Sequence, residues 1–229
     1  MAALWCVVPA AGRGTRVGGD CPKQYLPLAG RPLILHTLER LAAHPRIAGL
    51  LVALAADDGR WPGIGTLGGK PVLTAVGGGE RADSVLAGLR ALPSGVGQGD
   101  FVLVHDAARP CVRSGDIDRL IDAAIAGDGG LLGAPLRDTL KRADAHGRST
   151  LTEPREQRWR AFTPQMFRRG QLAAALGAAA REGVAVSDEA MAMERAGFAP
   201  LLVEGAEDNI KVTTAADFAL AEFLLSRTK

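Results

Sequence analysis

The sequence has few cysteines, and those present do not form a recognisable framework. Only Cys6, Cys21 and Cys111 occur among 229 residues, and no pair has CxxC or other metal-ligand spacing. Their odd number and wide separation argue against structural disulfides and favour a reducing compartment, so a cytoplasmic location is expected. Cys6 and Cys111 are interpreted as small buried hydrophobic residues.

Long apolar runs and runs of one charge are also missing. No stretch approaches the ~18 apolar residues of a membrane span. The formal net charge is +2 without a basic cluster, so we expect neither a membrane nor a nucleic-acid partner. The N-terminal MAALWCVVPAAG lacks a positively charged start, and a glycine-rich loop follows at once. We therefore interpret it as the first strand of the mature fold rather than as a signal peptide.

Hydrophobic residues make up 47% of the chain and charged residues 23%. This composition is typical of a globular protein with a sizeable core, and the length suits a single domain over residues 1–229. Apolar, β-branched-rich runs alternate with helical spacing. The runs expected to be strands are Leu4–Val8, Leu50–Leu54, Val72–Val76, Phe101–His105, Leu131–Pro135 and Leu201–Glu204. Helices are expected from Pro32, over Glu80–Leu92, from Ser114 and after Thr214. The alternation predicts a three-layer α/β fold with a mainly parallel sheet.

One segment departs from this pattern. Residues 137–165 are polar, basic and poor in helical period, and their two halves flank the turn-like sequence DAHGRS. A β-hairpin arm that projects from the domain and a solvated loop both fit this composition.

A glycine-rich loop, VVPAAGRGTRVGGDCPKQ, follows the first predicted strand. It lies where open α/β sheets bind ligands, beyond the carboxyl end of a strand. Gly12 and Gly14 allow backbone N–H groups to approach an anion, and Arg13, Arg16 and Lys23 add positive charge. Phosphate is the expected guest. The P-loop pattern is absent, and the dinucleotide pattern GxGxxG fails at Val17, so neither an ATPase nor a dehydrogenase is favoured.

Four later motifs carry further polar residues. Asp106 follows a predicted strand and is a candidate Mg²⁺ ligand, since Mg²⁺ takes one or two carboxylates plus phosphates; a helix cap or an ion pair with Arg109 are the alternatives. Asp208 is a candidate second ligand, and Lys211 a candidate phosphate contact. The stretch GGGERADSV opens a helix and offers N–H donors, with Ser84 near a base, although a plain strand–helix loop explains it equally. SDEA reads as a helix N-cap, and the histidines show no metal spacing.

Together these stretches resemble the 2-C-methyl-D-erythritol 4-phosphate cytidylyltransferase family. The matching motifs, in family order, are VVPAAGRGTR, CPKQYLPLAG, GGGERADSVLAGL, VHDAARP, DTLKR, FTPQMF, SDEA and VEGAEDNIKVTT. They span almost the whole chain. The resemblance implies a Rossmann-like nucleotidyltransferase fold with a protruding β-arm at about residues 137–165, and a homodimer in which interlocked arms help to complete the partner's active site.

The resemblance also implies a role for individual residues. Ala10, Ala11, Gly12 and Gly14 would line the nucleotide, with Gly78 and Ser84 near the cytosine. Arg16, Lys23 and Lys211 would act on the phosphates, and Asp106 would bind Mg²⁺. The residues that would surround the acceptor are Arg109, Thr139, Arg155, Thr163 and Ser187. Two positions depart from the family pattern. Gly79 stands where Asp is frequent, and Ser187 where Thr is common. The segment between Lys141 and Trp159 matches poorly, which leaves Arg155 the least secure assignment.

The implied reaction transfers CMP from CTP to 2-C-methyl-D-erythritol 4-phosphate. A phosphate monoester has a second pKa of ~6 and is already an anionic nucleophile near neutral pH, so no catalytic His or Cys is required. Ribitol-5-phosphate cytidylyltransferase, with the same chemistry on a related polyol phosphate, is the nearest alternative. A molybdenum-cofactor nucleotidyltransferase shares only the first loop. A non-catalytic nucleotide-binding module would be expected to lose Lys23, Asp106 or Lys211, all of which are present.

Overall fold

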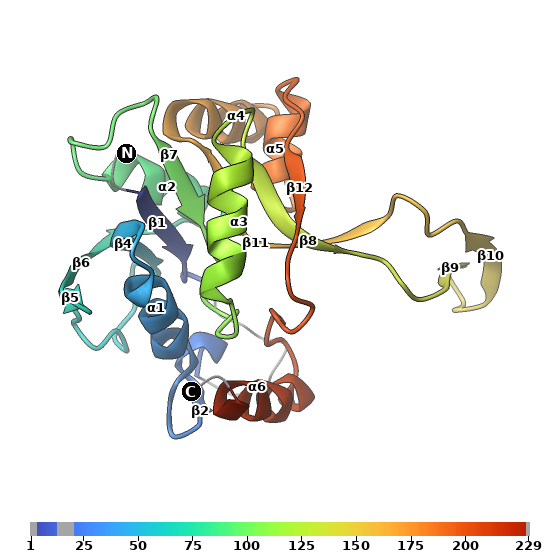
Figure 1. Ribbon diagram of the computed structural model, residues 1–229, viewed down its shortest axis with the longest axis horizontal. Helices are drawn as coiled ribbons and strands as arrows, with labels where there is room; N and C mark the ends of the chain where they lie inside the picture. Colours follow the sequence, from blue (N-terminus) through green and yellow to red (C-terminus); the bar gives the residue numbers. More distant parts are fainter. Residues whose placement is uncertain (1–3, 13–20, 228–229) are drawn as a thin grey trace.

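A single mixed sheet forms the middle layer of the structure, a computed structural model that describes residues 4–12 and 21–227 (Figure 1). Its strand order is β12-β8-β11-β7-β1-β4-β6-β5. The strands are β1 (Leu4–Pro9), β4 (Ile47–Leu54), β5 (Thr66–Leu67), β6 (Lys70–Val76), β7 (Phe101–Val104), β8 (Gly130–Pro135), β11 (Trp159–Arg168) and β12 (Leu201–Glu204). All neighbours are parallel except β5 with β6 and β11 with both of its neighbours. The predicted mainly parallel sheet is confirmed.

Helices cover both faces of the sheet. They are α1 (Leu33–Ala43), α2 (Arg81–Ala91), α3 (Ser114–Ala124), α4 (Arg169–Arg181), α5 (Glu189–Arg195) and α6 (Ala215–Arg227), with a short 3₁₀ helix, η2 (Lys23–Tyr25). Helices α1, α2, α3 and α6 begin within a residue or two of the predicted starts. Ser114, expected to cap α3, is instead its first residue, with Arg113 before it. Among the described residues no helix is long and apolar enough to cross a membrane.

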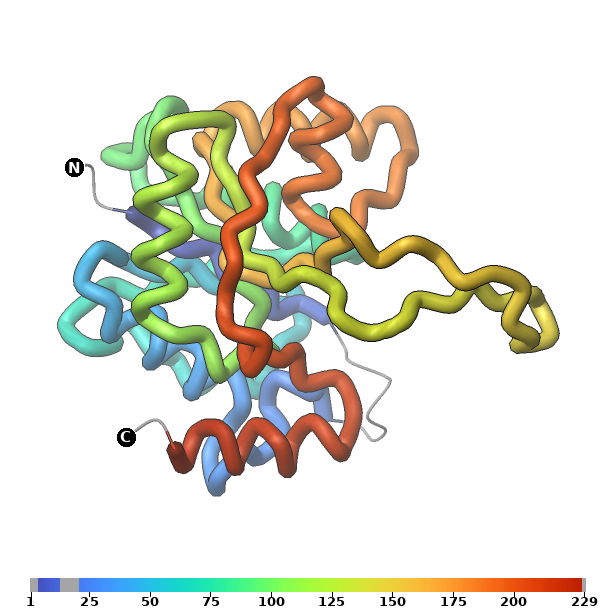
Figure 2. The backbone as a smooth tube through the Cα atoms, turned by 45° about the vertical axis from the view of Figure 1, so that its right-hand side comes forward, coloured from blue at the N-terminus to red at the C-terminus, as the bar shows by residue number. Residues whose placement is uncertain are grey.

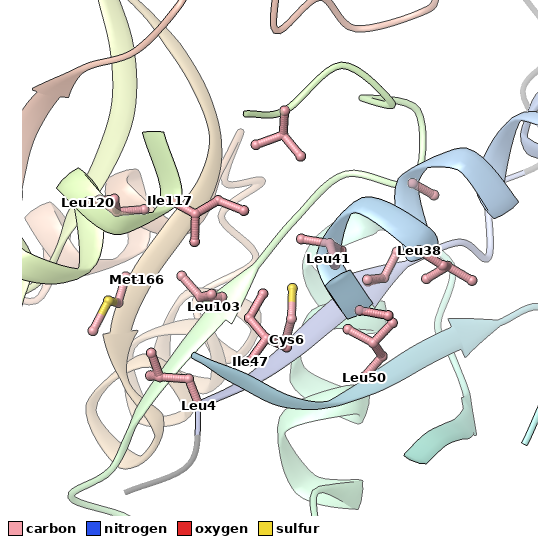
Figure 3. Close-up of a cluster of buried hydrophobic side chains, with 14 of the residues drawn as sticks. Leu4, Cys6, Leu38, Leu41, Ile47, Leu50, Leu103, Ile117, Leu120 and Met166 are labelled. Carbon is pink, nitrogen blue, oxygen red and sulfur yellow. The ribbon is translucent and has the colours of Figure 1, made fainter. Parts of the chain in front are cut away.

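The side chains of each parallel strand alternate between two cores, because successive residues of a strand point to opposite faces. On one face, Cys6 and Val8 of β1 pack with residues of α1 and α3 (Figure 3). On the other, Val7 packs against α2, so closely that a Cβ on Gly88 would lie 2.5 Å from its methyl group. The strands therefore read as continuous apolar runs in the sequence, and three layers result.

The strand order reverses between β1 and β7. From β1 the chain adds β4 and then β6 on one side, and α2 then carries it back to β7 on the other side of β1. At such a switch point the connections leave in opposite directions and open a crevice beyond the carboxyl ends of the two strands. The loops after β1 and β7 meet at this crevice.

The segment that broke the sequence pattern forms a hairpin and a sheet strand. Strands β9 (Leu140–Ala143) and β10 (Ser149–Glu153) pair antiparallel around the DAHGRS turn and project from the body (Figures 1 and 2). β11 then returns, and from Phe162 to Phe167 it is buried between β7 and β8. The predicted boundary at Gln165 was therefore wrong: the projecting part ends at about residue 158, and we call residues 137–158 the hairpin segment.

Candidate active site

A pocket of about 210 Å³ opens at the switch point. It is lined by Pro9, Ala10, Ala11, Gly12, Lys23, Gln24, Gly78, Gly79, Glu80, Arg81, Ser84, Asp106, Ala107, Ala108, Lys211 and Thr213. These residues come from the four sequence motifs that predicted phosphate or nucleotide binding. A larger cavity of about 440 Å³ lies at the amino ends of the strands, but apolar residues such as Leu4, Phe101 and Ile121 form much of its wall. We place the site in the smaller pocket, because charged side chains converge there.

The start of the glycine-rich loop is held by hydrogen bonds on both sides of one residue. The Ala10 N–H donates to the carbonyl of Ala53 at 2.8 Å, and the Gln24 side chain donates to the Ala10 carbonyl at 2.7 Å. Among the described residues, no atom lies within 4 Å of where a Cβ on Gly12 would stand. Lys23 Nζ donates to the Val212 carbonyl at 3.1 Å, which joins this loop to the last motif. The predicted residues Gly14 and Arg16 lie outside the described residues.

The opposite wall is the N-terminus of α2. Glu80 and Asp83 form a capping box, and the Gly78 N–H donates to Ser84 Oγ at 3.2 Å. A Cβ on Gly78 would lie 2.3 Å from the Asp83 Cβ, so only glycine fits there. Gly78 and Ser84, both predicted nucleotide contacts, therefore hold one another in place across the pocket from Gly12.

Asp106 lies at the centre of a cluster of cations. Its Oδ1 is 2.8 Å from Arg81 Nε, and its Oδ2 is 2.9 Å from Lys211 Nζ and 3.5 Å from Arg109 Nε. Burial alone would raise the pKa of Asp106, but the charges of Arg81, Lys211 and Arg109 outweigh it and hold that pKa far below its usual range. The carboxylate is therefore charged, and both the predicted ion pair with Arg109 and a pocket-facing position are present.

Arg81 is a member of this cluster that the sequence did not single out. Its Nη1 and Nη2 lie 2.6 Å and 3.1 Å from the two oxygens of Glu189, on α5. Burial would lower the pKa of Arg81, but Glu189 and Asp106 raise it above its ordinary value. Both residues belong to quoted motifs, GERADSV and SDEA. The cap predicted for SDEA is confirmed, because Asp188 accepts from the Met191 N–H, but the motif gave no indication of the role of Glu189.

A buried polar wall stands behind Asp106. The Asp106 N–H donates to Thr163 Oγ1, whose hydroxyl lies 3.1 Å from His105 Nδ1. His105 Nε2 lies 3.0 Å from the Arg109 carbonyl, which can only accept, so the ring carries its proton on Nε2 and Thr163 donates to Nδ1. Burial lowers the pKa of His105 to about 4. His105 is therefore a packed, hydrogen-bonded residue of the wall.

Two predicted acceptor residues belong to this wall and do not line the pocket. Arg109 donates from Nη1 to the Asn209 carbonyl at 2.6 Å, and its guanidinium lies 5.2 Å from the centre of the Phe162 ring. Asn209 in turn donates to the carbonyl of Thr163. In the described pocket, Arg109 and Thr163 support Asp106 from behind. Asn209, which is completely buried, gave no signal in the sequence beyond its place in VEGAEDNIKVTT.

The remaining predicted residues are not brought to the pocket within one chain. Thr139 and Arg155 are exposed on the hairpin segment, where Arg155 donates to the Arg137 carbonyl. Ser187 lines a neighbouring cavity of about 260 Å³, which shares Glu80 and Arg81 with the pocket. Asp208 pairs with Arg113 through Oδ2, and its buried Oδ1 has no hydrogen-bond partner among the residues that the structure describes.

The described residues contain no group of three or more His, Cys, Asp or Glu side chains placed to hold a metal ion. A magnesium site with one carboxylate and several phosphate oxygens is still compatible with Asp106. Asp208 is not among the pocket-lining residues, so the structure does not bring the two predicted ligands together there. No lining residue is His or Cys in the part of the pocket that the structure describes.

Comparison with known proteins gives a consistent result. The family model for IspD, 2-C-methyl-D-erythritol 4-phosphate cytidylyltransferase, matches residues 4–227. A protein of that name from Xanthomonas campestris pv. campestris (strain 8004) is 61% identical over 97% of this chain and 84% of its own length. Another, from Stenotrophomonas maltophilia (strain K279a), is 59% identical over 99% and 98%. The crystal structure of the Francisella tularensis protein of the same name has a TM-score of 0.83 at 30% identity, covering 97% of this chain and 100% of that one.

Proposed function

The chain belongs to the 2-C-methyl-D-erythritol 4-phosphate cytidylyltransferase family, and we propose that the pocket at the β1–β7 switch point is where it performs that family's reaction. It transfers CMP from CTP to 2-C-methyl-D-erythritol 4-phosphate, which gives 4-diphosphocytidyl-2-C-methyl-D-erythritol and pyrophosphate, in the non-mevalonate isoprenoid pathway. The observation that carries the assignment of the site is the convergence of Gly12, Gly78, Asp106 and Lys211 on one pocket.

The nucleotide is proposed to lie between the first loop and the N-terminus of α2. Ala10, Ala11 and Gly12 offer backbone groups on one side, and Gly78 and Ser84 offer polar groups for the cytosine on the other. The open space at the Cβ positions of Gly12 and Gly79 leaves room for a ligand to approach the backbone.

The phosphates are proposed to lie against Lys23 and Lys211, with Arg16 of the loop added. The nucleophile is an oxygen of the acceptor's phosphate, which attacks the α-phosphorus of CTP while the bond to pyrophosphate breaks. Two anions must meet in this step, and charge develops on the leaving group. Positioned cations are the usual remedy in phosphoryl chemistry, and no proton has to be removed from the nucleophile.

Asp106 is proposed to hold Mg²⁺ together with phosphate oxygens. The magnesium ion, when bound, would neutralise charge on the triphosphate and its leaving group. Lys211 is 39% exposed and shares Asp106 Oδ2, so it can leave that oxygen and move to a phosphate when the nucleotide binds. Asp208 remains a prediction, because it lies outside the pocket lining.

A homodimer is proposed to complete the acceptor site. Thr139 and Arg155 lie on a segment that projects from the body, so their own pocket is not the natural target of their side chains (Figure 2). A second copy with the same projection can place them over this pocket, and a two-fold arrangement makes the exchange reciprocal. Three free cysteines support the further proposal of a reducing, cytoplasmic location.

Pyrophosphate release tests the function directly. The assay contains CTP and Mg²⁺, with 2-C-methyl-D-erythritol 4-phosphate or ribitol 5-phosphate in parallel reactions and a reaction without acceptor as control. We expect release with the first acceptor and loss of release when EDTA replaces Mg²⁺. Release only with ribitol 5-phosphate would contradict the acceptor assignment, and full release in EDTA would contradict the magnesium proposal.

A further inference from the structure

Glu189 carries a completely buried carboxylate beside the pocket, yet it is not a lining residue. A buried carboxylate is costly unless it is paired, and both oxygens of Glu189 accept hydrogen bonds from Arg81. Replacing a buried ion pair by apolar residues is often neutral or stabilising, so the pair is not explained by stability alone.

The geometry of Arg81 connects this carboxylate to the reaction centre. One edge of the guanidinium, Nη1 and Nη2, faces Glu189, and Nε faces Asp106 Oδ1. Because the guanidinium is planar and rigid, fixing one edge fixes the direction of the other. Arg81 is also the first residue of α2, where the helix dipole disfavours a cation, so local helix stability does not account for it.

Glu189 is itself held in place from the sheet. Gln165, buried in β11, donates from its amide to Asp188 Oδ2 at 2.9 Å and accepts from the Ala190 N–H at 2.8 Å. The residues before and after Glu189 are thus both tied to one side chain. A continuous chain of contacts runs from β11 through α5 and α2 to the loop after β7.

We propose that Glu189 is a positioning residue for Asp106 and acts through Arg81. The pair occupies Oδ1 of Asp106, so that Oδ2, the oxygen now facing Lys211, is the one presented to the phosphates and their divalent cation. This inference rests on the proposed metal-binding role of Asp106. Residues that orient a metal ligand without touching the metal typically change affinity or activity 10–100-fold when replaced.

The test is the affinity for CTP without acceptor, measured by titration calorimetry with Mg²⁺ and again with EDTA. We expect Glu189→Gln to weaken CTP binding in Mg²⁺ by about 10-fold and to leave binding in EDTA unchanged. Asp106→Asn should behave in the same way. Both changes are proposed to act through the presentation of Asp106 Oδ2 to the cation. The double variant should therefore bind CTP no more weakly than Asp106→Asn alone.

Two further variants guard against a merely structural effect. Arg81→Lys keeps the positive charge but removes the planar guanidinium that contacts both carboxylates. It should weaken CTP binding in Mg²⁺ as Glu189→Gln does, although Glu189 itself is unchanged. Glu182→Gln removes the partner of Arg195 in an exposed ion pair at the other end of α5, and should change neither affinity. Thermal unfolding of each variant verifies that the fold is intact.

The outcomes separate the inference from the proposed function. If Asp106→Asn weakens Mg²⁺-dependent binding but Glu189→Gln and Arg81→Lys do not, the positioning role is wrong and the metal role stands. Additive losses in the double variant would also overturn it. If Asp106→Asn leaves the Mg²⁺ dependence unchanged, the metal role fails, and the positioning role fails with it.

Discussion

The pocket and the hairpin segment hold their candidate residues in opposite ways. At the pocket, the buried carboxylate of Asp106 and its backbone are linked to α2, to β11 and to the last motif, which are far apart in sequence. In the hairpin segment, the side chains of β9 and β10 bond across the hairpin itself, as in Lys141 with Thr152 and Arg142 with Glu153. Both strands are almost entirely exposed.

This difference teaches which part of the site exists before ligand or partner arrives. The charges of the pocket are fixed by neighbours within one chain, so the pocket is preorganised for phosphate chemistry. In the hairpin segment, Arg155 donates to the Arg137 carbonyl, and Arg137 is tied to the body by exposed ion pairs with Glu204 and Glu207. Changes at the pocket should therefore affect chemistry in each subunit, whereas changes at the hairpin should affect assembly and the acceptor.

The largest effect is expected from removing a pocket cation. Lys23→Ala should lower turnover by roughly 10²–10³-fold, by analogy with the loss of one oxyanion-hole donor. The matched control is Lys141→Ala, a lysine of the hairpin, which should keep turnover near normal. Steady-state pyrophosphate release measures both. Near-normal turnover of Lys23→Ala would refute the proposed role of Lys23 at the phosphates and remove the expected difference between pocket and hairpin lysines.

The second effect concerns the buried wall and its pH dependence. The pKa of His105 is lowered from its ordinary 6.5 to about 4. Its neutral state thus contributes stability that is present above pH 6.5 and lost as the pH falls to about 4. The expected loss in unfolding free energy is about 3 kcal/mol. Chemical denaturation at several pH values measures it, and His105→Gln should flatten the profile. An unchanged slope in that variant would contradict the assignment.

The third effect tests the shared site by mixing two variants, each impaired in a different part of the site. Arg155→Ala should raise the KM for the acceptor by roughly 10-fold, the loss of a rim charge contact. At low acceptor concentration, mixed dimers of Lys23→Ala and Arg155→Ala contain one site with both native residues. Random mixing should then restore roughly a quarter of normal activity. No recovery after verified subunit exchange would show that each chain uses its own hairpin.

The smallest effect is expected within the hairpin. Arg142→Ala removes the ion pair with Glu153, whose arginine is 64% exposed. Exposed pairs contribute only about 0–1 kcal/mol, so unfolding by denaturant should change little. A loss well above this range would mean that the hairpin is coupled to the core more strongly than its contacts indicate.

Much of the fold was predictable because its signals are local. Buried parallel strands such as β1 and β7 are continuous apolar runs, and the Thr214–Asp217 spacing marks the start of α6, where Asp217 accepts from the Thr214 N–H. The sheet strand β11 was missed in part. Its sequence, WRAFTPQMFR, begins in the polar hairpin segment, and its antiparallel place between β7 and β8 depends on long-range pairing.

For the site, sequence indicated residue types but not their partners. The glycines and charged residues of the loops were recognised as candidates from their residue types and motifs. The structure brings five of them to one pocket: Gly12, Gly78, Lys23, Asp106 and Lys211. Arg81 and Glu189 could not be distinguished from surface charges, because a buried ion pair leaves no periodic trace when its members lie 108 positions apart. Only folding reveals that pairing.

Strand β11 has one further consequence. Its ten residues run from the base of the hairpin into the sheet, with an irregularity in the pairing with β8 between Ala161 and Gln165. In that part of the strand Thr163 supports Asp106, and Gln165 anchors α5. At about 3.3 Å per residue, a regular strand of this length spans roughly 33 Å. In the proposed dimer, a partner that binds the hairpin segment would therefore also restrain β11, the strand whose Thr163 supports Asp106. The proposed dimer contact and the geometry around Asp106 would thus depend on the same strand, so a change that loosens the hairpin should also alter the position of Asp106.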